Sequence, residues 1–577
     1  MCGIFGITGF KRERLENARE ALHTLEHRGP DQWSDFYNLD IYLGHRRLSI
    51  LDLSENGRQP MGSEDGSVKI IVNGEIYNYK VLKKELEKEF TFKSESDSEV
   101  VLHGYRKWGI ENLLEKIDGM YAFAIYDQAS AELHLVRDRA GIKPLYYSYI
   151  NQQVVFASEL KAIQEYLAAD QLSVDYTAAY DFLTHKYIPA PKTLYKNIFK
   201  LEPGNRLTVD LSKGSISRYK YWSLEIGNNG DTIETAIPKI RQLVRDSVNE
   251  QMMSDVPVGF FLSGGLDSSA VVAAAAENNS NLNTFSIGFS DKSHDETHYA
   301  DIVADHFGTN HKKKILDEKK TGELFHNLKK WYDEPYADFS CFPTYLVSKF
   351  AREEATVVLT GDGGDEVFGG YNWYNQFIKK SRFRFPALSG ISKQMPNFYN
   401  KQHLLAKIGR KIEYPHMLND LELYTKIMSG YTRKEKEKYR LKWEIPSDYD
   451  DYWYFRKYYR QNLDTFTRLQ YLDFNTYLPD DILTKVDRVS MAVSLECRVP
   501  LLSKDIIEYM FALPPHTRLF NNELKGAMKQ AFNDVLPEEI INRDKKGFSI
   551  PLRSWKDDLF ESGADLKEYV IDQVFKL

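Results

Sequence analysis

The stretch that decides the fold of this chain is Val258-Gly259-Phe260-Phe261-Leu262-Ser263-Gly264-Gly265-Leu266-Asp267-Ser268-Ser269, and the alanine-rich run 270–276 follows it. An apolar run, a Ser-Gly-Gly turn and then strong helix formers predict a strand, a tight turn and a helix. Glycines let the backbone approach a ligand closely, and the first amides of a helix point outward at the positive end of its dipole. The sequence therefore predicts an anion site, to which Ser263, Ser268 and Ser269 add hydroxyl donors.

Asp267 indicates a metal ion as well. A carboxylate beside a phosphate repels it unless a cation lies between them, so we expect Mg²⁺ here. The Walker loop needs a lysine directly after its glycines, and none follows Gly264-Gly265. The stretch 263–269 instead resembles the pyrophosphate loop of enzymes that cleave ATP between the α and β phosphates to adenylate a substrate, which implies ATP as a co-substrate.

Composition and length narrow the class of protein. A chain of 577 residues usually organises more than one hydrophobic core, so two domains are expected. The formal charge of −7 argues against a nucleic-acid partner, and no apolar run approaches the roughly 20 residues that span a membrane. The N-terminus lacks the pattern of a secretory leader, which favours a cytoplasmic protein. Cys2, Cys341 and Cys497 form no CxxC pair, which excludes a disulfide framework and disfavours a zinc site.

The start of the chain suggests a nucleophile. Removal of Met1 would leave a thiol and a free α-amine on Cys2. An α-amine with a typical pKa of about 7.7 to 8.0 can act as the general base for its own side chain, so no histidine is needed. A buried cysteine near a terminus with no such role is the alternative when Cys2 is considered alone.

Three further segments carry candidate ligands for the same site. Arg47, in a strand of mixed basic and apolar residues, could pair with a substrate carboxylate through its planar fork. Asn73-Gly74 is typical of a hairpin turn, but an Asn amide and a Gly N–H can also form an oxyanion hole, with Glu75 receiving an ammonium. Asp97 precedes the helix predicted over 100–108, and we keep two readings for it: an N-cap or a ligand contact.

Together these motifs resemble the glutaminase domain of class II glutamine amidotransferases. The matching segments are Cys2-Gly3-Ile4, 27–31 (HRGPD), 47–50 (RLSI), 73–78 (NGEIYN), 118–123 (DGMYAF), 137–147 (RDRAGIKPLYY) and 156–159 (FASE). The resemblance implies an α+β fold of the N-terminal-nucleophile type, a four-layer αββα sandwich of two antiparallel sheets between helices. It assigns Cys2 as the nucleophile, and Asn73 and Gly74 as the oxyanion hole. The implied glutamine-binding residues are Arg47, Leu48, Ser49, Ile50, Leu51, Asn73, Gly74, Glu75 and Asp97.

A second domain is expected after a junction that lies between Asp210 and Gly230, a polar segment rich in turn residues. We therefore predict domains over 2–215 and 230–577. In the second, helices alternate with short apolar strands at 258–262, 284–289 and 355–360, which predicts a parallel sheet covered by helices, with ligands at the carboxyl ends of the strands.

The turn 361–366, with the sequence GDGGDE, follows one of those strands. By itself it could be a solvated acidic turn. Because it and the Ser-Gly-Gly loop both end strands of one sheet, we expect them to share a crevice. Asp365 is then the second ligand of the ion held by Asp267, and Thr360 and Gly361 border the nucleotide.

This half resembles the synthetase domain of glutamine-hydrolysing asparagine synthetases, an α/β fold of the adenine-nucleotide α-hydrolase type. The matching segments are the pyrophosphate loop, 367–371 (VFGGY), 484–488 (TKVDR) and 494–500 (SLECRVP). The resemblance implies that Lys545 contacts the phosphates and that Asp362 lies near the reacting intermediate. The ATP-binding candidates are Leu262, Ser263, Gly264, Gly265, Asp267, Ser268, Ser269, Ile287, Thr360 and Gly361, with Leu262 and Ile287 at the adenine.

The expected reaction joins the two domains. Glutamine hydrolysis at Cys2 supplies ammonia to an aspartyl adenylate formed from aspartate, ATP and Mg²⁺, giving asparagine, glutamate, AMP and pyrophosphate. Many asparagine synthetases carry Glu at the position of Asp362, so amidation of another carboxylate, such as a cell-wall or polysaccharide precursor, is an alternative. A regulatory homologue without turnover is another. The family resemblance also suggests a homodimer.

Overall fold

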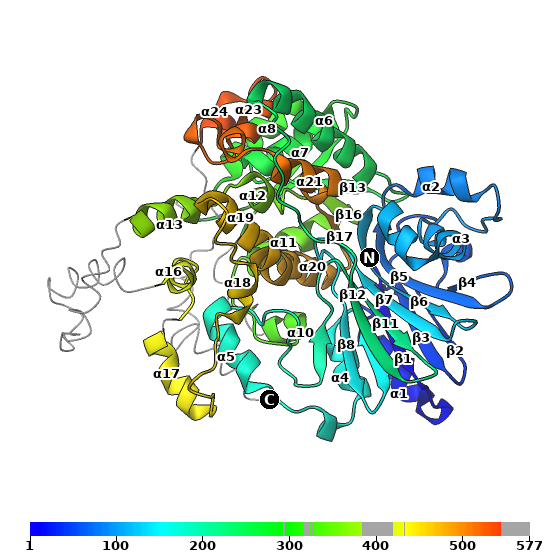
Figure 1. Ribbon diagram of the computed structural model, residues 1–577. Coiled ribbons are helices and arrows are strands. Elements are labelled where there is room, and N and C mark those ends of the chain that lie inside the picture. Colours follow the sequence, from blue (N-terminus) through cyan, green and yellow to red (C-terminus); the bar gives the residue numbers. More distant parts are fainter. Residues whose placement is uncertain (292–294, 317–323, 325–326, 383–418, 432, 544–577) are drawn as a thin grey trace.

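The structure is a computed structural model that describes residues 1–577 except 292–294, 317–323, 325–326, 383–418, 432 and 544–577. In its N-terminal half, two antiparallel sheets, each of six described strands, lie face to face (Figure 1). The first has the order β10-β8-β9-β1-β3-β2, from Ile198–Lys200, Tyr146–Ile150, Gln153–Ala157, Gly3–Thr8, Ile41–Arg47 and Gln32–Tyr37. The second has the order β12-β11-β7-β6-β5-β4, from Ser215–Lys220, Asn205–Asp210, Glu132–Arg137, Gly119–Asp127, Val68–Ile76 and Met61–Gly62.

Apolar residues on both faces of the strands create the layers. In β1, Ile4 packs between the two sheets against Leu43 and Ile71, whereas its neighbour Phe5 points to the other face. There the helices α1 (Leu15–His23) and α4 (Leu160–Tyr166) cover the first sheet. The helices α2 (Tyr79–Leu86) and α3 (Ser98–Lys116) cover the second. The predicted αββα sandwich is confirmed.

The C-terminal half contains a parallel sheet of five described strands in the order β15-β14-β13-β16-β17. These are Asn310–Leu316, Asn283–Phe289, Val258–Phe261, Val357–Leu359 and Glu496–Arg498. Residues of this sheet again pack into two cores, one on each face. Phe260 of β13 packs with α6 (Ile233–Gln251) and α7 (Leu266–Ala276), while Val358 of β16 packs with α11 (Cys341–Ala351) and α20 (Leu483–Met491). The predicted parallel sheet with helices on both faces is confirmed.

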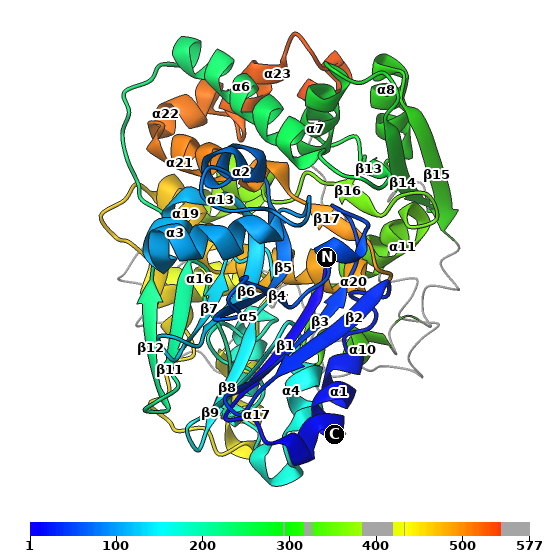
Figure 2. The ribbon, with the colours of Figure 1, turned by 90° about the vertical axis from the view of Figure 1, so that its right-hand side faces the viewer.

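Most of the other described helices lie around this sheet, whereas α5 (Tyr176–His185) and α17 (Arg433–Lys442) pack with the core on the outer face of the first antiparallel sheet (Figure 2). The remaining helices are α8 (Thr297–Phe307), α10 (Leu328–Tyr332), α12 (Gly364–Phe368), α13 (Asn372–Arg382), α16 (Asp420–Ile427), α18 (Trp453–Tyr458), α19 (Thr465–Asn475), α21 (Lys504–Ala512), α22 (Pro515–Arg518), α23 (Gly526–Phe532) and α24 (Glu538–Asn542).

The two halves pack on one another. The joining segment is held on the end of α21, because Gly227 N–H donates to the Phe511 carbonyl at 3.3 Å and Asn229 N–H to the Ala512 carbonyl at 2.8 Å. A buried ion pair crosses the interface: the Arg28 guanidinium lies 2.8 Å from Asp487 in α20. The bounds of the two predicted domains, 2–215 and 230–577, stay a prediction.

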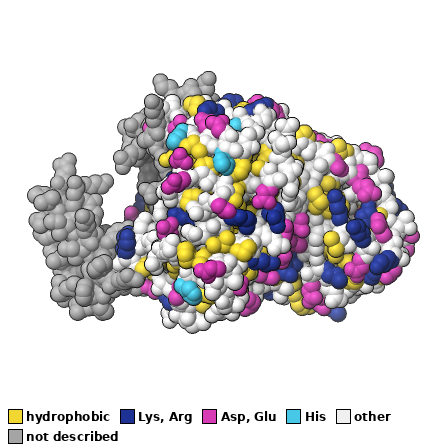
Figure 3. Space-filling view, turned by 90° about the horizontal axis from the view of Figure 1, so that it is seen from above, with side chains coloured by type: hydrophobic (Ala, Val, Ile, Leu, Met, Phe, Trp, Pro, Cys, Tyr) yellow, Lys and Arg dark blue, Asp and Glu magenta, His cyan; other side chains and the backbone are white. Residues whose placement is uncertain are grey.

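On the face seen in Figure 3, basic and acidic side chains are interspersed. No helix in the described part of the chain is long and apolar enough to cross a membrane. The exclusion of nucleic acid and the cytoplasmic location stay predictions.

Candidate active sites

Cys2 lies at the start of β1 beside Asn73 of β5. Because Met1 precedes it, the nitrogen of Cys2 is a peptide amide, and it donates to Asn73 Oδ1 at 3.0 Å. The other amide atom, Asn73 Nδ2, is buried with no hydrogen-bond partner among the described residues. Gly74 has a φ of 149°, and a Cβ there would lie 2.0 Å from the Met120 carbonyl oxygen, so only glycine fits. A buried amide donor beside Cys2 is the kind of group that stabilises an oxyanion.

Two residues of β17, from the other half of the chain, complete this Cys2 site. The buried Met1 ammonium lies 3.0 Å from Glu496 Oε2, and Arg498 Nε lies 2.6 Å from Glu496 Oε1. Although burial opposes ionisation, the ammonium and Arg498 hold the pKa of Glu496 at about 2. Arg498 also approaches Glu75 Oε1, at 3.4 Å. Neither Glu496 nor Arg498 was expected at this site from the sequence, where the segment 494–500 carried only part of a family resemblance.

The glutamine-binding candidates fall into two groups. The guanidinium of Arg47 donates to Gln32 Oε1 at 2.9 Å and to carbonyls of the following loop, including Ser54 at 3.0 Å and Leu51 at 3.2 Å. In the same loop Leu48 and Ile50 are buried beside Met1, while Ser49 N–H donates to Asp31. The hydrogen bonds of Arg47 and Ser49 thus fix the shape of the loop that packs beside Met1.

The acids Glu75 and Asp97 form the second group. Burial, followed by the charge of Asp97, raises the pKa of Glu75 well above its ordinary value. Burial likewise raises the pKa of Asp97 to about 6. Asp97 stands at the N-cap position of α3, but its side chain makes no capping hydrogen bond there and instead accepts one from Ile76 N–H at 2.6 Å. Two buried acids next to one another suit a site that receives a cationic group.

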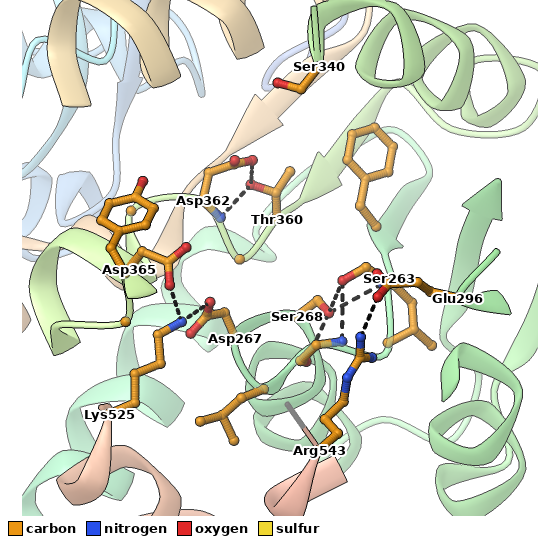
Figure 4. Close-up of a pocket in the computed structure, with 18 of the residues that line it drawn as sticks. Ser263, Asp267, Ser268, Glu296, Ser340, Thr360, Asp362, Asp365, Lys525 and Arg543 are labelled. Carbon is orange, nitrogen blue, oxygen red and sulfur yellow. Dashed lines mark hydrogen bonds and ion pairs between the residues drawn. The ribbon is translucent and has the colours of Figure 1, made fainter. Parts of the chain in front are cut away.

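The second site is a cavity of about 880 Å³ at the carboxyl ends of β13, β14 and β16 (Figure 4), which we call the strand-end cavity. The Ser-Gly-Gly loop forms one wall. Gly264 has a φ of 66° and a Cβ there would lie 2.5 Å from Tyr299, while Ser263 Oγ and Ser268 Oγ lie 3.1 Å apart. A Cβ on Gly361 would lie 2.7 Å from the Ser268 nitrogen, so the two predicted loops touch. The expected shared crevice is confirmed.

The predicted metal ligands converge on one point of this cavity. The ammonium of Lys525 contacts both Asp267 and Asp365, the latter at 2.6 Å. Although burial opposes its charge, these two carboxylates raise the pKa of Lys525 above its ordinary value. Two carboxylates that can hold one cation between them fit Mg²⁺, which takes oxygen ligands. Lys525, which the sequence analysis missed, stands at that position in this structure.

The remaining nucleotide candidates are placed as follows. Leu262, Ile287, Thr360 and Gly361 line the strand-end cavity. Ser269 is fully buried in α7 and is not among the described lining residues. Lys545 lies outside the described residues. Arg543, a cavity residue that the sequence analysis did not assign, donates to the Gly264 carbonyl at 2.7 Å and pairs with Glu296 at 2.6 Å.

The other end of the cavity is also polar. Asp362 accepts a hydrogen bond from Thr360 Oγ1 at 2.7 Å. Lys485 of α20 lies 3.0 Å from Ser340 Oγ and 3.4 Å from Asp338 Oδ2. Asp338 in turn accepts hydrogen bonds from the backbone N–H and the hydroxyl of Ser340, at 3.0 and 2.8 Å. The cavity lining includes Asp338, Ser340, Asp362, Lys485 and Thr360.

Both halves of the chain match known proteins in sequence. Residues 1–222 match the family described as "Glutamine amidotransferase domain", and residues 239–569 match that described as "Asparagine synthase". "Asparagine synthetase [glutamine-hydrolyzing] 1" of Bacillus subtilis is 35% identical over 96% of this chain and 88% of its own length. "Asparagine synthetase [glutamine-hydrolyzing] 3" of the same organism is 29% identical over 100% and 93%. "Amidase chyE" of Penicillium rubens is 26% identical over 94% and 86%.

Proposed function

The chain belongs to the asparagine synthase family, and we propose how its two sites divide the glutamine-dependent synthesis of asparagine between them. The protein is a glutamine-dependent ligase that uses ATP as a co-substrate. In the proposal, the Cys2 site releases ammonia from glutamine and the strand-end cavity activates aspartate. The observation that carries it is the presence, in one chain, of Cys2 beside the buried Asn73 amide and of two glycine loops around a cavity.

At the Cys2 site, removal of Met1 would free the α-amine of Cys2. The amine would take the thiol proton, and the sulfur would attack the side-chain carbonyl of glutamine. Asn73 Nδ2 and the Gly74 N–H would stabilise the oxyanion. Loss of ammonia leaves a γ-glutamyl thioester, which water hydrolyses to glutamate. Glu75 and Asp97 would hold the α-ammonium of the glutamine, and the Arg47 loop would hold its α-carboxylate.

In the strand-end cavity, the β-carboxylate of aspartate would attack the α-phosphorus of ATP, and pyrophosphate would leave. The Ser-Gly-Gly loop and the amides that open α7 would bind the pyrophosphate. Asp267 and Asp365 would hold Mg²⁺, which neutralises phosphate charge when bound. Ammonia would then attack the acyl carbon of the adenylate, giving asparagine and AMP. Asp362, in the turn 361–366 that also contains Asp365, would lie near the reacting carboxyl group.

The test follows the nitrogen atom. The purified protein, with Met1 removal checked by intact mass, is given ATP, Mg²⁺, aspartate and glutamine labelled with ¹⁵N in its side-chain amide. We expect AMP and asparagine in equal amounts, with the label in the asparagine amide. AMP release with a cell-wall or polysaccharide carboxylate but not with aspartate would instead support the alternative acceptor, which the short side chain of Asp362 favours. The homodimer stays a prediction.

A further inference from the structure

The polar end of the strand-end cavity contains a cation and an acid that the nucleotide does not need. Lys485 is 7% exposed, and its ammonium has two described acceptors, on Ser340 and Asp338. An ammonium has three N–H donors, so it can donate a hydrogen bond to one more partner. Burying a lysine is costly, and a lysine is kept in such a place only with compensating groups.

Asp338 and Ser340 serve to position that lysine. The carboxylate of Asp338 is occupied by the N–H and the hydroxyl of Ser340 as well as by Lys485. Although burial opposes the charge of Lys485, the carboxylates of Asp338 and Asp362 raise its pKa above the ordinary value. The lysine is therefore held as a cation whose direction is fixed before any ligand arrives.

Asp362 supplies the matching negative charge. Its single described side-chain contact is with Thr360 Oγ1, and a carboxylate offers about four acceptor positions. In Figure 4, Asp362 lies between Ser340 and the acids Asp267 and Asp365. Lys485 and Asp362 both line the cavity, and they lie close enough for the charge of Asp362 to raise the pKa of Lys485. A cation and an anion placed in this way are complementary to a zwitterion whose remaining end points toward the phosphate loops.

We propose that Lys485 and Asp362 bind the amino-acid head group of the acceptor, with Lys485 taking the α-carboxylate and Asp362 the α-ammonium. The inference rests on the proposed function and specifies it: the acceptor is an α-amino acid with a second carboxylate, and the head group selects it. The second carboxylate, two carbons from the α-carboxylate, then extends toward the phosphate loops.

The test uses three acceptors that differ by one charged group. β-Alanine is aspartate without its α-carboxylate, and succinate is aspartate without its α-ammonium. AMP release is measured with ATP, Mg²⁺ and an ammonium salt as nitrogen source, so the Cys2 site is not needed. For each variant, kcat/KM for aspartate is divided by kcat/KM for each analogue. Such a ratio is independent of the amount of folded protein and of any general loss of turnover.

In the wild-type protein we expect aspartate to be preferred over both analogues. Lys485→Met should lower the aspartate to β-alanine ratio by about 10- to 100-fold, the value of one charged hydrogen bond, and leave the aspartate to succinate ratio nearly unchanged. Asp362→Asn should do the reverse. Lys485→Arg should keep most of the preference, because the positive charge is retained.

Lys200→Met is the matched control. Lys200 is a lysine of similar burial that is paired with Glu334 at 2.6 Å and does not line the cavity. Its loss should leave both ratios unchanged. If wild-type protein uses aspartate but Lys485→Met keeps its aspartate to β-alanine ratio, the head-group site is refuted and the proposed function stands. If wild-type protein releases AMP with other carboxylates and not with aspartate, the proposed function fails and the head-group site fails with it.

Discussion

Lys525 offers the sharpest test of the metal position. Its ammonium contacts Asp267 and Asp365 at the point where Mg²⁺ is expected, so the ion must displace the lysine before it can bind. Lys525→Met removes this competitor and its positive charge from beside the two carboxylates. We therefore expect the variant to bind Mg²⁺ more tightly than the wild-type protein does, in the absence of nucleotide.

The size of the effect follows from the burial of the pair. Removing one partner of a buried ion pair costs about 3 to 5 kcal/mol. The lysine side chain is 7% exposed, but those of the two acids are 19% and 20% exposed, so we take about 3 kcal/mol, the lower end. Since 1.36 kcal/mol is one factor of ten, displacing Lys525 should weaken Mg²⁺ binding by about 100-fold in the wild-type protein. The variant should be less stable in EDTA and recover most of the difference when Mg²⁺ saturates the site.

The assay is a calorimetric titration of Mg²⁺ into metal-free protein, with thermal unfolding followed in parallel. Lys529→Met is the control, because Lys529 lines the same cavity and pairs with Glu523, an acid that is 52% exposed. That surface-type pair contributes roughly 1 kcal/mol or less, so its loss should leave the Kd for Mg²⁺ near the wild-type value. A Kd for Lys525→Met equal to or weaker than that of the wild-type protein would refute the reasoning, and with it the shared position of the lysine and the ion.

Three further predictions concern Cys2, Asp267 and His45. Cys2→Ala should lose glutamine-dependent synthesis and keep synthesis from ammonium salts, increasingly as pH rises and more free ammonia is present; retained Met1, detected by intact mass, should have the same effect because it caps the amine that acts as base. Asp267→Asn should reduce AMP formation by at least 100-fold while a glutaminase assay still detects glutamate release, and unchanged AMP formation would remove Asp267 as a metal ligand. Burial lowers the pKa of His45 to about 3, so below about pH 6.5 the unfolded state binds a proton that the folded state does not. The free energy of unfolding should therefore decrease as the pH is lowered from about 6.5 to about 3, by up to about 1.36 kcal/mol per pH unit. His45→Gln should flatten that part of the pH profile of unfolding, and an unchanged profile would contradict the assignment.

The sequence predicted those parts of the sites that are continuous along the chain. A Ser-Gly-Gly turn between an apolar strand and an alanine-rich helix has few other interpretations, and the turn 361–366 follows a neighbouring strand of the same sheet. Residues that complete a site from a distance gave no such signal. Lys525 meets Asp267 across 258 positions of sequence, and nothing local in a segment between two short helices indicates that contact.

Asp97 shows the limit from the other side. Its position before a helix is typical of an N-cap, yet its carboxylate accepts the Ile76 N–H of a neighbouring strand instead. Local propensity could not decide between these partners, because the competing donor comes from a segment that reaches it only through the tertiary fold. The segment 494–500 gave as little local signal: it carried part of a family resemblance, and nothing in it indicated a strand that contacts both sites.

That strand, β17, bears on how independent the two half-reactions are. The predictions for Cys2 and Asp267 treat the sites as separable, because the candidate residues first assigned to each lie on opposite sides of the chain junction. In the structure, however, the side chains of Glu496 and Arg498 reach Met1 and Glu75, while the Arg498 carbonyl accepts a hydrogen bond from Thr360 N–H at 2.9 Å. One short strand is thus bonded through its side chains to the Cys2 site and through its backbone to the loop that borders the nucleotide. The candidate catalytic residues of each site come from one half of the chain, but the positions of both sets depend on this shared strand.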